Sequence, residues 1–364
     1  MKKRVCCILL AVMPLLCGCS DIYSKGTDVG SLIVIDALGA DAADAADALL
    51  RISLVPFREK QTEDALFLCA EGETVTQAEE YCRESSDHGV LFFHHISHVL
   101  LGAELDRDGL HAVLDHICRS PEILLDVPMF RCIDASAEEV LRESAKTLPE
   151  RMLLLRQNAK QNGDFFLTNA SALLDRELRG RVSLLCALSY APSFEQENGE
   201  EAKTLQFAGY ELVSDGEKCG FFPKEDLIGV LLLGEKKGRS LVSVTVEERS
   251  ATFRVTPRCC RVSAVRGEGG QLTALSIDAE VSCDMADAPY ALGSTEFLTA
   301  VSGKVNAMLR RTAEGCMEAN ADVFDWEEKL ELSEGEFALL SELPLEVRVT
   351  AKLLRTDDWK EQGQ

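Results

Sequence analysis

All six histidines of the chain fall within one stretch, and imidazole is a frequent metal ligand and acid–base catalyst. They are His88, His94, His95, His98, His111 and His116. His94 and His98 are four residues apart, which in a helix would place both rings on one face, as in a zinc site. The segment lacks the glutamate that follows the first histidine of an H-E-x-x-H motif, and residues 90–93 before it predict a strand. His111 and His116 lie about 500° apart around a helix and do not share a face. We therefore expect hydrogen-bonded or solvated histidines, no metal site and no cofactor.

Motifs for nucleophilic catalysis and phosphate binding are missing from the sequence. It contains no G-x-S-x-G, no G-x-x-x-x-G-K-[ST] and no G-x-G-x-x-G pattern. The glycine-rich residues 267–270 lie between two predicted strands with no helix behind them, which indicates a hairpin turn. The sequence therefore predicts no catalytic residues and a protein that is not an enzyme.

The N-terminus has the pattern of an exported lipoprotein. Lys2, Lys3 and Arg4 precede 12 uncharged residues, 5–16, whereas a helix needs about 20 apolar residues to span a bilayer. The segment Leu16-Cys17-Gly18-Cys19 is similar to the bacterial lipobox, so we expect cleavage before Cys19 and attachment of diacylglycerol to its thiol. The alternative is an ordinary cleaved signal peptide followed by a chance cysteine.

Charge and length limit the functions open to the exported chain. Removal of residues 1–18 takes away three basic residues and no acidic one, which changes the formal net charge from −23 to −26. This acidity argues against binding of nucleic acid, which requires basic patches, and anionic headgroups would repel the protein, so the lipid must supply the membrane contact. About 345 residues then suffice for two or three domains.

Ten cysteines lie beyond Cys19, most of them within apolar-periodic segments. We expect buried thiols there, because a free cysteine behaves as a small apolar residue. Disulfide pairing is the alternative for an exported chain, and the sequence does not determine its connectivity.

Periodicity and turn signals divide the chain into a signal peptide (1–18), a lipidated tether (19–30) and three domains. In the N-terminal α/β domain (31–147) we expect strands at 32–35, 49–57, 90–93 and 124–133. Helices should begin near Thr74 and Ser136, which have capping-box spacing, and a third should carry the apolar stripe Leu110, Val113, Leu114 and Ile117.

The middle α/β domain (148–243) should contain helix over 153–178, broken near residue 163, a strand at 181–190, a loop at 193–201 and a hairpin at 214–217. The C-terminal α+β domain (244–358) should contain an alternating strand at 275–281, a long helix from Thr295 and an edge strand at 345–353. The fold class is therefore α+β, with three mixed α/β domains and predominantly antiparallel or mixed sheets.

Several short motifs follow one another along nearly the whole chain. Near the N-terminus these are Leu38-Gly39-Ala40-Asp41 and Gly72-Glu73-Thr74-Val75-Thr76-Gln77-Ala78. The next two are His95-Ile96-Ser97-His98-Val99-Leu100-Leu101-Gly102-Ala103-Glu104 and Leu114-Asp115-His116-Ile117-Cys118-Arg119-Ser120-Pro121-Glu122. The last three are Ala208-Gly209-Tyr210-Glu211-Leu212, Asp226-Leu227-Ile228-Gly229-Val230-Leu231 and Asn320-Ala321-Asp322-Val323-Phe324. Gly39 and Gly102 in these motifs suit tight turns at the end of a strand.

In this order and content the chain resembles the Ger(x)C family of spore germination lipoproteins, the C subunits of nutrient germinant receptors. The resemblance implies a non-enzymatic, lipid-anchored subunit on the outer face of the spore inner membrane. Its implied partners are the integral-membrane A and B subunits. Such a receptor responds to a small-molecule germinant, but the resemblance does not imply that this subunit contacts the germinant directly. Two departures stand out. Asp325-Trp326-Glu327-Glu328 replaces the glycines usual after the last motif, and Asp106 and Arg107 replace small, apolar residues.

Two other classes of protein compete with this interpretation. A solute-binding lipoprotein of a transporter would require two similar α/β lobes around a cleft, whereas three unlike domains are expected here. A surface metalloenzyme would require His94 and His98 to bind zinc together.

Overall fold

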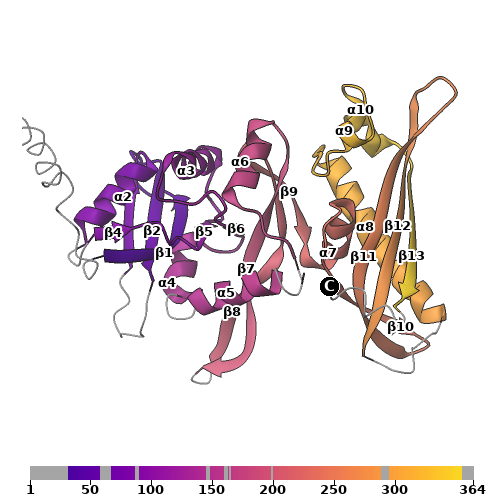
Figure 1. The fold of residues 1–364 in the computed structure, drawn as a ribbon, viewed down its shortest axis with the longest axis horizontal. Helices are drawn as coiled ribbons and strands as arrows, with labels where there is room; N and C mark the ends of the chain where they lie inside the picture. Colours follow the sequence, from indigo (N-terminus) through magenta and orange to yellow (C-terminus); the bar gives the residue numbers. More distant parts are fainter. Residues whose placement is uncertain are drawn as a thin grey trace, which may run out of the picture.

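The computed structural model describes residues 32–57, 67–86, 90–144, 148–159, 163, 165–197, 200–287 and 295–354. These residues form two β-sheets side by side along the long axis of the molecule, each with helices packed on it (Figure 1). The combination of mixed sheets and helices confirms the expected α+β fold class.

The first sheet has nine strands in the order β3-β2-β1-β5-β6-β7-β8-β9, with β4 also paired to β1. Its central strands β1, β5, β6 and β7 run parallel to one another, and the pairs toward both edges are antiparallel. The strands are β1 (Leu32–Ala42), β2 (Leu50–Pro56), β3 (Leu68–Gly72), β4 (Val90–Phe92), β5 (His98–Leu101), β6 (Met129–Cys132), β7 (Ser183–Glu197), β8 (Glu200–Ser214) and β9 (Glu217–Pro223).

Helices cover both faces of this sheet (Figure 1). One face packs against α2 (Val75–Glu84), α3 (Arg107–Arg119) and α6 (Ala170–Leu178), and the other against α4 (Ala137–Ser144) and α5 (Leu148–Gln157). Successive side chains of β1 point to opposite faces of the sheet, so β1 contributes to both cores. Leu38 belongs to the core with α2 and α3, whereas Ala37 belongs to the core with α4.

The second sheet has four strands in the order β10-β11-β12-β13. These are β10 (Ser240–Val246), β11 (Arg249–Arg266), β12 (Leu272–Asp287) and β13 (Leu345–Leu353), and β13 is the expected edge strand. The long helix α8 (Thr295–Glu318) packs on this sheet, followed by α9 (Trp326–Lys329), α10 (Glu336–Leu339) and the 3-10 turn η5 (Leu340–Glu342).

A fully buried helix, α7 (Leu227–Leu233), joins the two halves of the molecule after the 3-10 turn η3 (Lys224–Asp226). It packs against α8, and Gly229 permits the close approach. A Cβ atom at Gly229 would lie 2.3 Å from Thr312 Oγ1 and 3.0 Å from the Met308 carbonyl oxygen. One apolar core runs through this contact, from the first sheet to the second.

Local sequence signals predicted several elements correctly. Thr74 and Ser136 cap α2 and α4, and the apolar stripe of α3 is buried as expected. The hairpin at 214–217 is also confirmed, with Asp215 and Gly216 at positive φ.

Three expectations were wrong. The first motif, residues 38–41, continues β1 rather than forming the tight turn expected around Gly39, and the strand expected at 124–133 is shortened to β6. The loop expected at 193–201 is largely strand, because the pairing of β7 with β8 extends to Glu197 and Glu200 without apolar alternation.

The first sheet contains strands from both sides of residue 147, so the predicted N-terminal and middle domains contribute to one sheet. The second sheet begins at Ser240, close to the predicted start of the C-terminal domain at residue 244. The division into three domains stays a prediction.

We expect Gly229→Ala to lower the free energy of unfolding by about 1–3 kcal/mol, because the added methyl group would overlap α8 in a packed core. Urea denaturation followed by circular dichroism measures this change. Gly303→Ala in α8 is the matched control, since a Cβ there meets nothing within 4 Å. It should raise stability by about 0.5–1 kcal/mol. Equal effects at the two positions would contradict the close approach of α7 to α8.

Candidate functional site

The predicted lipidation site, Cys19, lies outside the described residues, as do the signal peptide (1–18) and the tether (19–30). Lipidation of Cys19 therefore stays a prediction. Within the part of the chain that the structure describes, no helix is long and apolar enough to cross a membrane.

His94 and His98 do not form the helical pair that a zinc-dependent enzyme would need. His98 is fully buried in β5, and its Nδ1 lies 2.7 Å from Ser97 Oγ. Burial lowers its pKa to about 3, so the ring is neutral at physiological pH. His94 is exposed in the turn before β5 and stacks on Phe92 at 4.7 Å between ring centroids. His88 lies outside the described residues.

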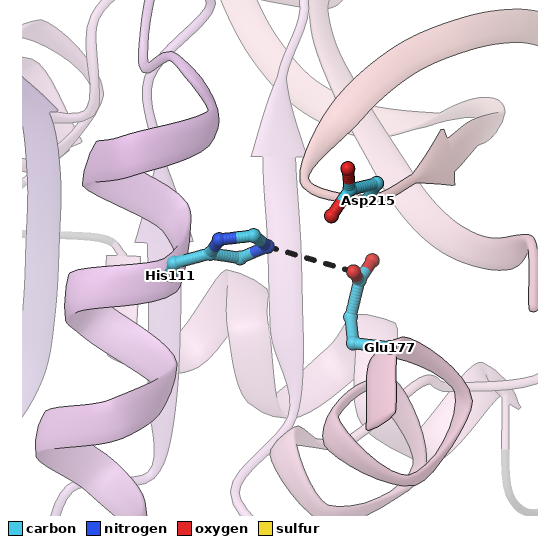
Figure 2. A group of neighbouring side chains, drawn as sticks. All are labelled: His111, Glu177 and Asp215. Carbon is cyan, nitrogen blue, oxygen red and sulfur yellow. Dashed lines mark ion pairs between the residues drawn. The ribbon is translucent and has the colours of Figure 1, made fainter. Parts of the chain in front are cut away.

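A different histidine belongs to a compact polar cluster. His111 of α3, Glu177 of α6 and Asp215 of the β8–β9 turn point toward one another, with one ligand-type atom of each within 4.8 Å of the others (Figure 2). His111 Nε2 lies 3.6 Å from Glu177 Oε2, and Arg107 Nη2 lies 2.7 Å from Asp215 Oδ2. Sequence reasoning missed this cluster, because its three residues come from segments far apart in the chain and no spacing rule relates them.

Asp41, the last residue of the first motif, holds the start of α4. Its carboxylate accepts hydrogen bonds from the amides of Ala137 (2.6 Å) and Glu138 (2.8 Å), where the helix dipole favours negative charge. Burial nevertheless raises the pKa of Asp41. Gly102 provides the space, since a Cβ there would lie 1.8 Å from Asp41 Oδ1.

Gly39 has a related role, although it was expected at a turn. It lies inside β1, and a Cβ there would approach Leu141 Cδ1 of α4 to 2.6 Å. Together, Gly39, Asp41 and Gly102 fix α4 against the sheet.

A buried ion pair connects strands that are not neighbours. Arg131 of β6 and Glu211 of β8 meet across β7, with Nε 2.8 Å from Oε1 and both side chains at most 4% exposed. Arg131 Nη1 also donates to the carbonyl oxygens of Gly102 (2.7 Å) and Leu105 (3.1 Å).

The last motif lies where α6 meets the C-terminal half. Asp322 accepts hydrogen bonds from the amides of Trp326 (2.6 Å) and Glu327 (2.9 Å), which begin α9. Asp325, at a position where glycine was expected, has φ of 58° and pairs with Arg176 and Arg181. A cavity of about 200 Å³ opens beside these residues and is smaller than most pockets for drug-sized ligands.

The described cysteines beyond Cys19 are free thiols, and half of them are buried. Burial raises the pKa of Cys82, Cys132, Cys186 and Cys283 to about 12. A thiol with so high a pKa is a weak nucleophile, because the thiolate is the reactive form. These four cysteines are therefore unsuited to covalent catalysis.

Comparison with known proteins identifies a similar family and a similar fold. Residues 27–176 match the family model described as the spore germination protein N-terminal domain. The fold is similar to the crystal structure of the GerBC protein, with a TM-score of 0.51 and 12% sequence identity over 87% of this chain and 97% of that chain. No curated protein sequence matches the chain.

We expect Asp41→Ala to lower the free energy of unfolding by about 2–4 kcal/mol, because two amide groups at the start of α4 would lose a charged acceptor. Asp41→Asn retains one oxygen acceptor and should cost less. Asp115→Ala is the surface control, since Asp115 forms an exposed pair with Arg119 and should change stability by about 0.5 kcal/mol. A loss for Asp41→Ala no larger than for this control would exclude the anchoring role of Asp41.

We expect the stability of the protein to depend on pH through His98. Because its folded pKa is lowered from 6.5 to about 3, its contribution is present in full above pH 6.5. This contribution is lost as the pH falls from 6.5 toward 3, because over this range the His98 side chain takes up a proton in the unfolded state and not in the folded state. Between pH 7 and pH 5, wild type should lose up to about 2 kcal/mol more than His98→Gln in urea denaturation. His94→Gln, at an exposed position, should follow wild type; identical pH curves for His98→Gln and wild type would disprove the assignment.

Proposed function

Because the chain belongs to the Ger(x)C family of spore germination proteins, we propose that it is the lipid-anchored, non-enzymatic C subunit of a nutrient germinant receptor. The observation that carries the proposal is the match of residues 27–176 to the germination-protein domain, together with a GerBC-like fold over 87% of the chain. The partners would be integral-membrane A and B subunits, and the location would be the outer face of the spore inner membrane.

The anchor would keep the folded part close to its membrane partners. β1 begins at Leu32, and the 13 residues from Cys19 to this strand can span at most about 45 Å. The N-terminal part of the first sheet would then be the part nearest to the membrane. Such tethering raises the effective concentration of the protein near other membrane subunits without any new contact.

The environment of the polar residues supports a role without catalysis. Arg131 and Glu211 neutralise each other inside the protein, and the carboxylates of Asp41 and Asp322 bind helix amides. These groups support the fold and are therefore not available to act on a substrate.

The test is germination of spores that lack this gene and carry either wild type or Cys19→Ala. We expect loss of the response to one set of nutrients, with sporulation intact, and rescue by wild type only. Cys17→Ala is the matched control, because it leaves Leu16, Gly18 and Cys19 of the lipobox in place and should rescue germination.

Full rescue by Cys19→Ala would show that lipidation is not needed. Normal germination of a strain stripped of this gene and all related genes would overturn the receptor assignment itself. Loss of copurification with the A and B subunits in the Cys19→Ala strain would support the role of the anchor in assembly.

A further inference from the structure

We propose that His111, Glu177 and Asp215 form a binding site for one divalent transition-metal ion, for which zinc is the representative probe. The site is separate from the lipid anchor and does not depend on the receptor assignment. It revises the expectation from sequence that the chain has no metal site.

The spacing of the cluster fits a metal better than a direct hydrogen bond. His111 Nε2 and Glu177 Oε2 are 3.6 Å apart, which is too long for an effective hydrogen bond. Two ligand atoms on a tetrahedral zinc ion, each at about 2.0–2.1 Å from the metal, lie about 3.4 Å apart. All three donor atoms lie within 4.8 Å of one another, so small side-chain movements suffice for coordination.

Glu177 gives an independent indication that a ligand belongs here. Its side chain is only 7% exposed, and its Oε1 is buried without a hydrogen-bond partner among the described residues. A buried carboxylate oxygen without a partner is costly, and a bound cation would remove that cost. Figure 2 shows this carboxylate directed from α6 toward His111 and Asp215.

Gly216 leaves room at the metal-binding nitrogen of His111. A Cβ atom at this position would lie 2.9 Å from His111 Nε2 and 2.8 Å from Arg107 Cγ. The residue has φ of 77°, so glycine also suits the hairpin turn. The turn thereby brings Asp215 close to the imidazole without covering its nitrogen.

Charge and donor type define the class of ion. Glu177 and Asp215 supply two negative charges and Arg107 one positive charge, so the cluster is attractive to a cation. One imidazole nitrogen with two carboxylate oxygens suits zinc or manganese, whereas calcium and magnesium prefer oxygen ligands alone. Asp215 is 65% exposed, which gives an ion access from solvent and leaves a coordination position for water.

A bound ion would connect three segments, because its ligands come from α3, α6 and the β8–β9 turn. Among the described residues, the Arg107–Asp215 pair and the long contact between His111 and Glu177 link these side chains. Metal binding should therefore stabilise the folded chain.

The experiment is zinc titration of the purified full chain by calorimetry, with bound metal counted by elemental analysis. We expect one zinc ion that is bound at least tenfold more weakly by His111→Gln and by Glu177→Gln, and a zinc-dependent rise in melting temperature that both variants lose. His116→Gln is the matched control, because His116 of the same helix lies 3.0 Å from Glu79 and is not part of the three-residue cluster. Cysteine thiols are the same in all these variants, so their background binding cancels in the comparison.

Absence of stoichiometric zinc on wild type, or unchanged affinity in a folded His111→Gln or Glu177→Gln variant, would overturn the proposal. Should the His111→Gln or Glu177→Gln variant fail to fold, Asp215→Asn at the exposed position serves instead, and it must weaken binding. Because this measurement uses purified protein, its failure leaves the germination result unaffected, and a germination failure leaves the zinc result unaffected.

Discussion

The buried guanidinium of Arg131 needs partners inside the first sheet that compensate its charge. An unpaired charge inside a protein is strongly unfavourable, so Arg131 requires Glu211 on β8 and the carbonyl oxygens of Gly102 and Leu105 at the same time. These partners lie on both sides of residue 147. The ion pair therefore ties the segments predicted as N-terminal and middle domains into one sheet, and separating them would leave a charge buried without its partner.

Close approach is the second constraint, and it accounts for the family motifs better than turn geometry does. Gly39 leaves room for α4 on the sheet, and Gly102 leaves room for the Asp41 carboxylate. Gly229 allows α7 and α8 to pack closely. At each position a methyl group would overlap a neighbouring atom. The three motifs that contain Gly39, Gly102 and Gly229 therefore mark contacts between layers of the fold.

Features that depend on residues close together in the sequence were predictable, whereas features that depend on distant residues were not. The caps at Thr74 and Ser136 and the Asp215–Gly216 turn depend on residues within four positions, and they were predicted correctly. The pairing of β7 with β8 beyond residue 193 depends on backbone partners in the other strand, and its polar sequence gave no signal. The cluster of His111, Glu177 and Asp215 could not be predicted from the sequence either. Only the packing of α3, α6 and the β8–β9 turn brings these three residues together.

Asp325 shows how a departure from the family pattern is accommodated. With φ of 58° it occupies the left-handed region, where glycine is easiest and aspartate is among the better-tolerated residues. Its carboxylate oxygens lie 3.2 Å from both Nη atoms of Arg176 and 3.1 Å from Nη1 of Arg181. A glycine could adopt the same backbone but could not bind these two arginines. The substitution therefore exchanges backbone freedom for a charged contact between α6 and the C-terminal half.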